Sequence, residues 1–157
     1  MALFDGPTGA EYSPTMTPAF DLAAKRHYSD GMVLHGSGRY DNADHLAGLA
    51  AECALKALLA AVPGVTVNAK GILVDSASTR YNLHVEDLWG SVQAVPAAAP
   101  SQAQAALAAL PTTNPFHGWS ISDRYAAPHI SQAVASAHLA AALVLLETWS
   151  AATGVPL

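Results

Sequence analysis

Apolar residues recur at steps of three and four along two consecutive segments near the start of the chain. The first begins at Thr17-Pro18, a capping hydroxyl followed by proline at the first helical position, and ends at HGSG, residues 35–38. The second, RYDNADHLAGLAAECALKALLAA, follows directly and ends at VPG, residues 62–64. One face of it carries Ala43, Leu46, Ala50, Cys53, Ala57 and Leu58. Because only a few residues separate the two segments, we predict an antiparallel helical hairpin.

The helical pattern is weaker in the middle of the chain. Residues 65–81 are predicted to be a loop in which VTV and ILV form short extended pieces. The segment NLHVEDLWGSV predicts a short helix with Asn82 as its N-cap. After the interruption PAAAP, the segment SQAQAALAAL predicts another helix, in which Ser101 and Gln104 form a capping box.

A long last helix is predicted in PHISQAVASAHLAAALVLLETWSAAT, closed by Gly154. It is expected to begin at Pro128, because proline lacks a helical N–H and its ring clashes with the carbonyl one turn earlier. Its predicted apolar stripe consists of Ile130, Val134, Ala137, Ala141, Val144 and Leu145. The apolar run HLAAALVLL is too short to span a bilayer and predicts a buried helix. The pattern as a whole predicts a bundle of four main helices with a short extra one.

The composition supports a single all-α domain. The chain has 157 residues, of which 52% are hydrophobic and only 12% are charged, and alanine dominates. Alanine is the best helix former and fills a sheet poorly. We expect an extended arm over residues 1–17 and one helical domain over residues 18–157. The arm has no basic region followed by an apolar run, so no signal peptide is expected.

Charge and cysteine content narrow the classes of function. The net charge of −5 argues against non-specific binding of nucleic acid, so any contact with RNA must be local and specific, or depend on a second subunit or a partner. The single cysteine, Cys53, excludes an internal disulfide and fits a reducing, cytoplasmic location. The seven histidines include no His-x3-His pair and there is no cysteine cluster, so neither a metal site nor a cofactor is predicted.

Several sequence features, in this order and spacing, resemble the HEPN (higher eukaryote and prokaryote nucleotide-binding) domain family. They are the turn SGRY at 37–40, the run AECALK at 51–56, the segment NLHVEDLW at 82–89, and Trp119 followed by Arg124-Tyr125. The resemblance covers most of residues 18–153 and implies an up-and-down four-helix bundle that is often a homodimer. Some members of the family are metal-independent ribonucleases of toxin or defence type. Others are non-catalytic binding modules, some of them paired with a nucleotidyltransferase.

The stretch SDRYAAPHISQ contains the candidate catalytic pair, Arg124 and His129, which matches the Arg-x4-6-His spacing of catalytic HEPN proteins. Histidine suits the general base that RNA cleavage requires, and arginine suits the charge that builds on the phosphate. Three residues depart from the family pattern. Tyr125 stands where active members usually have a polar residue, and Ser131 stands where several toxins have a tyrosine. Pro128 would separate Arg124 from the helix that carries His129.

Each candidate also has a structural interpretation. Glu52 lies among alanines in the middle of a helix, and a buried carboxylate needs a partner, so we predict a Glu52–Arg124 ion pair. His129 is expected to be an exposed residue of the first helical turn. Lys56 is expected to extend its side chain toward solvent near a helix end, and His84 to form a local hydrogen bond.

The sequence therefore predicts a HEPN-like helical module that binds a nucleotide, RNA or a protein partner without catalysis. Binding candidates are Tyr125, Glu52, Lys56 and His84. The alternative is a metal-independent endoribonuclease with His129 as base and Arg124 on the phosphate. A homodimer is expected, with an antitoxin or a nucleotidyltransferase as candidate protein partners and no role at a membrane.

Overall fold

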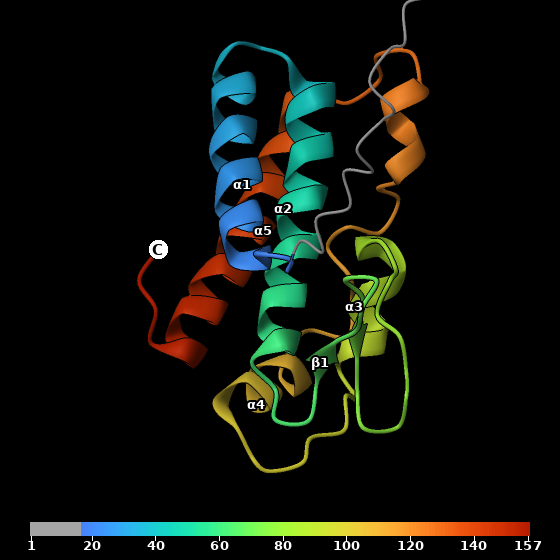
Figure 1. Ribbon diagram of the computed structural model, residues 1–157. Coiled ribbons are helices and arrows are strands. Elements are labelled where there is room, and N and C mark those ends of the chain that lie inside the picture. Colours follow the sequence, from blue (N-terminus) through green and yellow to red (C-terminus); the bar gives the residue numbers. More distant parts are fainter. Residues whose placement is uncertain (1–16) are drawn as a thin grey trace, which may run out of the picture.

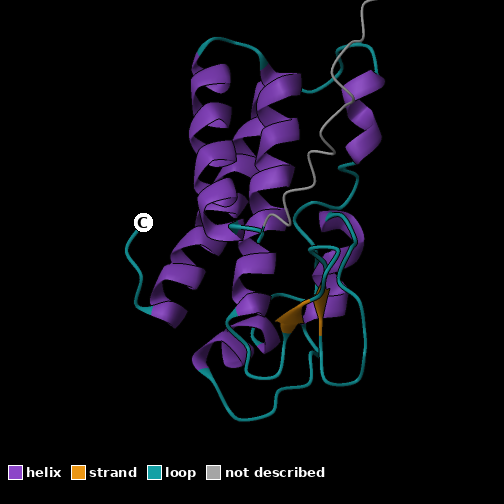
Figure 2. Ribbon diagram, in the orientation of Figure 1, coloured by secondary structure: helices purple, strands orange, loops and turns teal. Residues whose placement is uncertain are grey.

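The structure, a computed structural model, describes residues 17–157, which are mostly helical (Figure 1). Its elements in chain order are α1 Phe20–Gly36, α2 Tyr40–Ala60, β1 Thr66–Val67, β2 Leu73–Val74, α3 Val85–Val92, α4 Gln102–Ala108, the 3-10 helix η1 Ile121–Tyr125 and α5 Gln132–Thr153. Within the described range the only strands are β1 and β2, which pair antiparallel in a small hairpin (Figure 2). The all-α prediction is thus confirmed, as are the two extended pieces in the loop after α2. Apart from Thr17, the predicted arm lies outside the described residues.

Helix α2 is the central element of the fold. It packs against α1 and α5, and also against α3, α4 and η1. In Figure 1, α1 and α2 stand side by side, α5 lies behind them, and α3 and η1 lie on the other side of α2. The predicted α1–α2 hairpin is confirmed, and its turn contains Gly38 at φ +72°, a backbone conformation that favours glycine.

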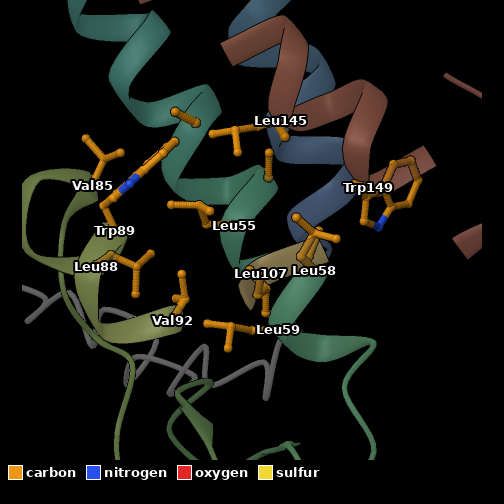
Figure 3. Packing of buried hydrophobic residues seen from close by; sticks show 14 of the residues in the cluster. Leu55, Leu58, Leu59, Val85, Leu88, Trp89, Val92, Leu107, Leu145 and Trp149 are labelled. Atoms are coloured by element: carbon orange, nitrogen blue, oxygen red, sulfur yellow. The ribbon is translucent and has the colours of Figure 1, made fainter. Parts of the chain in front are cut away.

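One cluster of buried side chains draws on all five α-helices of the described chain. In Figure 3, leucines of α2 lie between α3 on one side and α5 on the other. The labelled core residues are Leu55, Leu58, Leu59, Val85, Leu88, Trp89, Val92, Leu107, Leu145 and Trp149. Each fully buried leucine contributes about 1.5–3 kcal/mol, so this cluster joins the five helices.

The first and the last predicted helices begin later than their sequence signals indicated. Helix α1 begins at Phe20, with Ala19 at the N-cap position and no side-chain cap, so Thr17-Pro18 precedes the helix. Helix α5 begins at Gln132, four residues after Pro128. Its cap is Ser131, whose Oγ accepts a hydrogen bond from the N–H of Val134 at 3.3 Å.

The caps of the two short helices also differ in part from prediction. The N-cap position of α3 is His84, two residues after Asn82, and no side chain caps that end. Ser101 does cap α4 by accepting from the N–H of Gln104. The side-chain amide of Gln104 donates to the carbonyl of Val95 instead of completing a capping box.

The apolar stripe predicted for α5 was wrong by about one position. Val134 and Val144 are 40% and 58% exposed, and Ala137 is also exposed. The buried side is formed by Ala135, His138, Leu139, Ala142, Leu145, Leu146 and Trp149. In a helix this rich in alanine and leucine, nearly every register looks apolar, so the period does not mark one face.

Helix α5 is also longer than the apolar run that suggested a short core segment. By length and composition this helix of 22 residues is sufficient to cross a membrane, and an 18-residue window within it has a mean hydropathy of 1.4. In the structure its leucine-rich side packs against α2 and α1, as the core helix of a globular domain does.

Candidate functional site

Glu52 of α2 forms the centre of a polar group that we call the Glu52 cluster, consisting of Glu52, Lys56 and His84. Glu52 is only 8% exposed. Its Oε1 accepts a hydrogen bond from Lys56 Nζ at 2.6 Å, and its Oε2 lies 2.9 Å from His84 Nδ1. A buried carboxylate is costly unless it is paired, and both of its oxygens are paired here.

His84 reaches the cluster from the start of α3. Its backbone is extended and its carbonyl accepts the N–H of Leu88 at 2.8 Å, so the helix fixes the position of the residue. The carboxylate of Glu52 can only accept, so Nδ1 is the donor in this hydrogen bond. The side chain is 45% exposed. The imidazole is therefore held on its inner side and open to solvent on its outer side.

The predicted Glu52–Arg124 ion pair is not formed. Both oxygens of Glu52 are taken by Lys56 and His84, and Arg124 is exposed on η1. The guanidinium carbon of Arg124 lies 4.7 Å from the ring centre of Tyr125, which is itself 78% exposed. A lysine four residues along the same helix reaches the carboxylate more directly than an arginine on a distant turn does.

The expectations for Lys56 and His84 were also wrong. The side chain of Lys56 is only 14% exposed and turns toward Glu52 instead of extending into solvent. His84 bonds to a residue 32 positions away instead of locally. The Glu-x3-Lys spacing was the available signal for the first contact, because residues four apart face each other on a helix.

Arg124 and His129 are held separately, and no hydrogen bond or ion pair joins them in residues 17–157. A capping box of Ser120 and Asp123 fixes η1 and thereby Arg124. His129 lies in the extended segment before α5, where its backbone N–H donates to Asp41 Oδ1 at 2.8 Å. His129 is exposed, as expected, but it precedes the first helical turn.

Sequence reasoning missed an aromatic stack beside this loop. The ring of His45 stacks on Trp119 with 5.6 Å between ring centres, and the Trp119 Nε1–H donates to the carbonyl of Asp44 at 3.0 Å. Gly48 makes room for the indole, because a Cβ at that position would lie 2.0 Å from a Trp119 ring carbon. His45 Nδ1 is buried, with no hydrogen-bond partner among the described residues. The stack anchors the loop that leads into η1 to α2.

A second missed contact lies deeper in the fold. Asp44 and His138 are 1% and 8% exposed, and Asp44 Oδ1 lies 2.5 Å from His138 Nδ1. The ring of Phe116 stacks on His138 with 4.9 Å between centres. The pair joins α2 to α5 across 94 positions of sequence, a separation that leaves no local signal.

Burial and neighbouring charges also shift the pKa values of two further histidines, His45 and His27. Burial lowers the pKa of His45, and the nearby charge of Arg124 lowers it further, with a smaller contribution from His84. Burial and then Arg26 lower the pKa of His27 on α1, and Glu52 acts in the opposite direction. Hydrogen bonds and charge effects thus link six residues, of which Glu52 and Lys56 are largely buried. We call this set the histidine face: His27, His45, Glu52, Lys56, His84 and Arg124.

Cys53 lies next to Glu52 on α2. Burial raises the pKa of its thiol to about 11, and Glu52 adds to the effect while Lys56 and Arg26 oppose it. A thiol of that kind is not a nucleophile at neutral pH. No group of three histidine, cysteine, aspartate or glutamate residues in the described range is arranged to hold a metal ion.

No protein-family model, curated protein or solved structure matches this chain. The likeness to HEPN domains therefore rests on the residues quoted above.

Proposed function

We propose that the protein is a HEPN-like helical module that binds a phosphate-bearing ligand, a nucleotide or RNA, on the histidine face. Arginine, lysine and protonated histidine are the side chains that recognise phosphate. In this proposal α1, α2 and α5 supply three helices of the HEPN-like bundle, and the α3–α4 region takes the place of the fourth. The residues of the face come from α1, α2, η1 and the N-cap position of α3.

The observation that carries the proposal is the arrangement of charge around Arg124. Its guanidinium is exposed and forms no salt bridge with any carboxylate in residues 17–157. The carboxylate of the adjacent Asp123 is already engaged, because its Oδ2 accepts the N–H of Ser120 at 3.0 Å. Arg124 is thus available to a phosphate, although the whole chain is acidic.

Tyr125 adds a surface for a base. Its ring is the most exposed large hydrophobic side chain of the described chain and lies beside the Arg124 guanidinium. Every base has a π-face, so stacking on an exposed ring contributes about 1–3 kcal/mol without reading sequence. A nucleotide with its phosphate at Arg124 and its base at Tyr125 would use both features.

The geometry supports binding better than cleavage through Arg124 and His129. The two residues do not share a helix, because η1 ends at Tyr125 and α5 begins at Gln132. His129 Nδ1 lies 3.0 Å from the carbonyl of Ala127, and its main chain is tied to Asp41. The pair therefore lacks the shared rigid support that the spacing had suggested.

Binding of a short fluorescein-labelled single-stranded RNA, measured by fluorescence anisotropy, tests the proposal. Arg124→Ala is expected to weaken binding about tenfold, the loss of one charge-assisted contact of about 1.4 kcal/mol. Arg80→Ala, which removes an exposed arginine from the loop after β2, is the matched control and should bind as the wild type does. Unlabelled ATP as competitor separates a nucleotide site from an RNA site. Equal dissociation constants for the two variants would refute the proposal.

A further inference from the structure

We propose that a cavity beside Trp149 binds a free small organic cation, an ammonium group that carries an apolar body and a hydroxyl. The cavity has a volume of about 240 Å³ and lies where the start of α1, the last turn of α2 and the end of α5 meet. It shares no residue with the histidine face, so the site is independent of the proposed function. The residues that line it include Phe20, Asp21, Ala57, Ala60, Ala61 and Trp149.

Two aromatic side chains and three alanines form most of the cavity wall. Trp149 is only 5% exposed and lies at the edge of the core residues labelled in Figure 3, and Phe20 is half-buried. Because an alanine side chain is a single methyl group, the α2 wall leaves room for a ligand beside the rings. A cation is attracted to the face of an aromatic ring, and Lys25 Nζ already lies 4.8 Å from the ring centre of Trp149.

Asp21 supplies a negative charge to the cavity. Its carboxylate forms no ion pair within residues 17–157. In the first turn of α1 it offsets the positive end of that helix. The last turn of α2 adds further negative charge, because the carbonyl end of a helix is negative and this turn contains no basic residue. The charge of the cavity wall therefore suits a cation.

Lys25, one turn along α1 from Asp21, does not supply that cation. Its Nζ donates to the carbonyl of Pro156 at 2.9 Å, and it forms no salt bridge with Asp21. It lines a second cavity, together with Tyr28 and Leu146, instead of this one. The wall of the cavity beside Trp149 thus contains one carboxylate and no basic side chain.

Trp149 also leaves a hydrogen-bond donor for the ligand. The other two tryptophans of the chain, Trp89 and Trp119, donate their Nε1–H to backbone carbonyls at 2.8 Å and 3.0 Å. The Nε1–H of Trp149 has no acceptor in the described part of the chain, although the side chain is almost fully buried. A buried donor without an acceptor is costly, and a hydroxyl oxygen of the ligand would accept this N–H. The class of ligand that fits is therefore an amino alcohol.

The test uses the full chain and two probes of nearly equal size and shape, choline and its uncharged analogue 3,3-dimethylbutan-1-ol. Isothermal titration calorimetry measures both dissociation constants. We expect choline to bind about tenfold more tightly, because the analogue keeps the apolar body and the hydroxyl but lacks the charge. Asp21→Asn should weaken choline binding about tenfold and leave binding of the analogue unchanged. Asp30→Asn, at an exposed position of the same helix, is the matched control and should bind both probes as the wild type does.

Two further variants separate the hydroxyl contact from the cavity itself. Trp149→Phe keeps an aromatic ring but removes the N–H, so it should weaken both probes by the same factor. Ala60→Leu puts a larger side chain in the wall and should also weaken both, and circular dichroism should show each variant folded.

Equal binding of choline and the analogue, binding of neither by the wild type, or undiminished choline binding by Asp21→Asn would refute the proposal. Sedimentation of the protein with phosphatidylcholine vesicles, which carry the same head group on a lipid surface, would overturn the assignment to a free small molecule.

Discussion

Two carboxylate–histidine pairs lie on α2, two turns apart, and they differ in what surrounds the imidazole. In the Asp44–His138 pair both partners are buried, and Phe116 covers the ring. In the Glu52–His84 pair only the carboxylate is buried, and the ring reaches solvent. The same kind of bond therefore joins two buried side chains in one place, and in the other it holds an imidazole that solvent reaches. Exposure of the histidine, not the bond itself, distinguishes the two.

The largest expected effect of breaking either pair is at His138. His138→Ala leaves Asp44 buried without its partner, and removing one member of a buried pair costs about 3–5 kcal/mol. Urea unfolding followed by circular dichroism would measure the loss. The double variant Asp44→Ala/His138→Ala should recover part of it, since no charge is then left unpaired. A loss below about 1 kcal/mol would mean that the pair does not join α2 to α5.

A smaller effect is expected at Gly48, which separates the buried pair from the Glu52 cluster. Gly48→Ala puts a Cβ 2.0 Å from the Trp119 ring, and overpacking of this kind costs about 1–3 kcal/mol. Thermal unfolding would detect the change. Gly90→Ala is the matched control, because nothing lies within 4 Å of a Cβ at that helical position. It should stabilise the protein by about 0.5–1 kcal/mol, the helix propensity difference.

Lower pH should destabilise the fold through His45 and His27. Burial lowers the pKa of His45 and of His27, so the unfolded chain binds protons that the folded chain does not. Stability is then fully present above the ordinary histidine pKa of about 6.5 and is lost as pH falls below it. The melting temperature should drop between pH 7.5 and pH 5, and His45→Phe should drop less. An identical drop in that variant would show that His45 does not contribute to the pH dependence.

The smallest effect on stability is expected at His84. Because its ring is exposed, His84→Gln should change the free energy of unfolding by no more than about 0.5 kcal/mol. Urea unfolding beside His138→Ala would show the contrast between the two histidines directly. A loss as large as that at His138 would mean that the Glu52–His84 bond is mainly structural.

Local signals predicted the parts of the fold that depend on neighbouring residues. The α1–α2 hairpin follows from two periodic segments and the short stop between them, and the cap of α4 follows from Ser101. The register of α5 could not be predicted, because alanine and valine surround its true core face. That face includes a histidine, His138, which any hydropathy pattern assigns to the surface.

The candidate site was predicted in its residues but not in its contacts. Glu52, Lys56, His84 and Arg124 were all singled out, yet the partner of Glu52 was taken to be Arg124. Whether Glu52 pairs with Lys56, one turn away, or with Arg124, 72 positions away, depends on the path of the loop that leads into η1. The sequence alone does not show that path. That path is set by Trp119 inserting at Gly48, a long-range contact with no periodic signal.

The chemistry of Cys53 also makes the molecule convenient to observe. With a pKa of about 11, only about one thiol in ten thousand is ionised at pH 7, so maleimide dyes will react with it very slowly. It is the only cysteine of the chain. A second cysteine introduced at the exposed Ser122 would therefore take up a fluorophore almost alone, and its emission would report directly on ligands arriving beside Arg124.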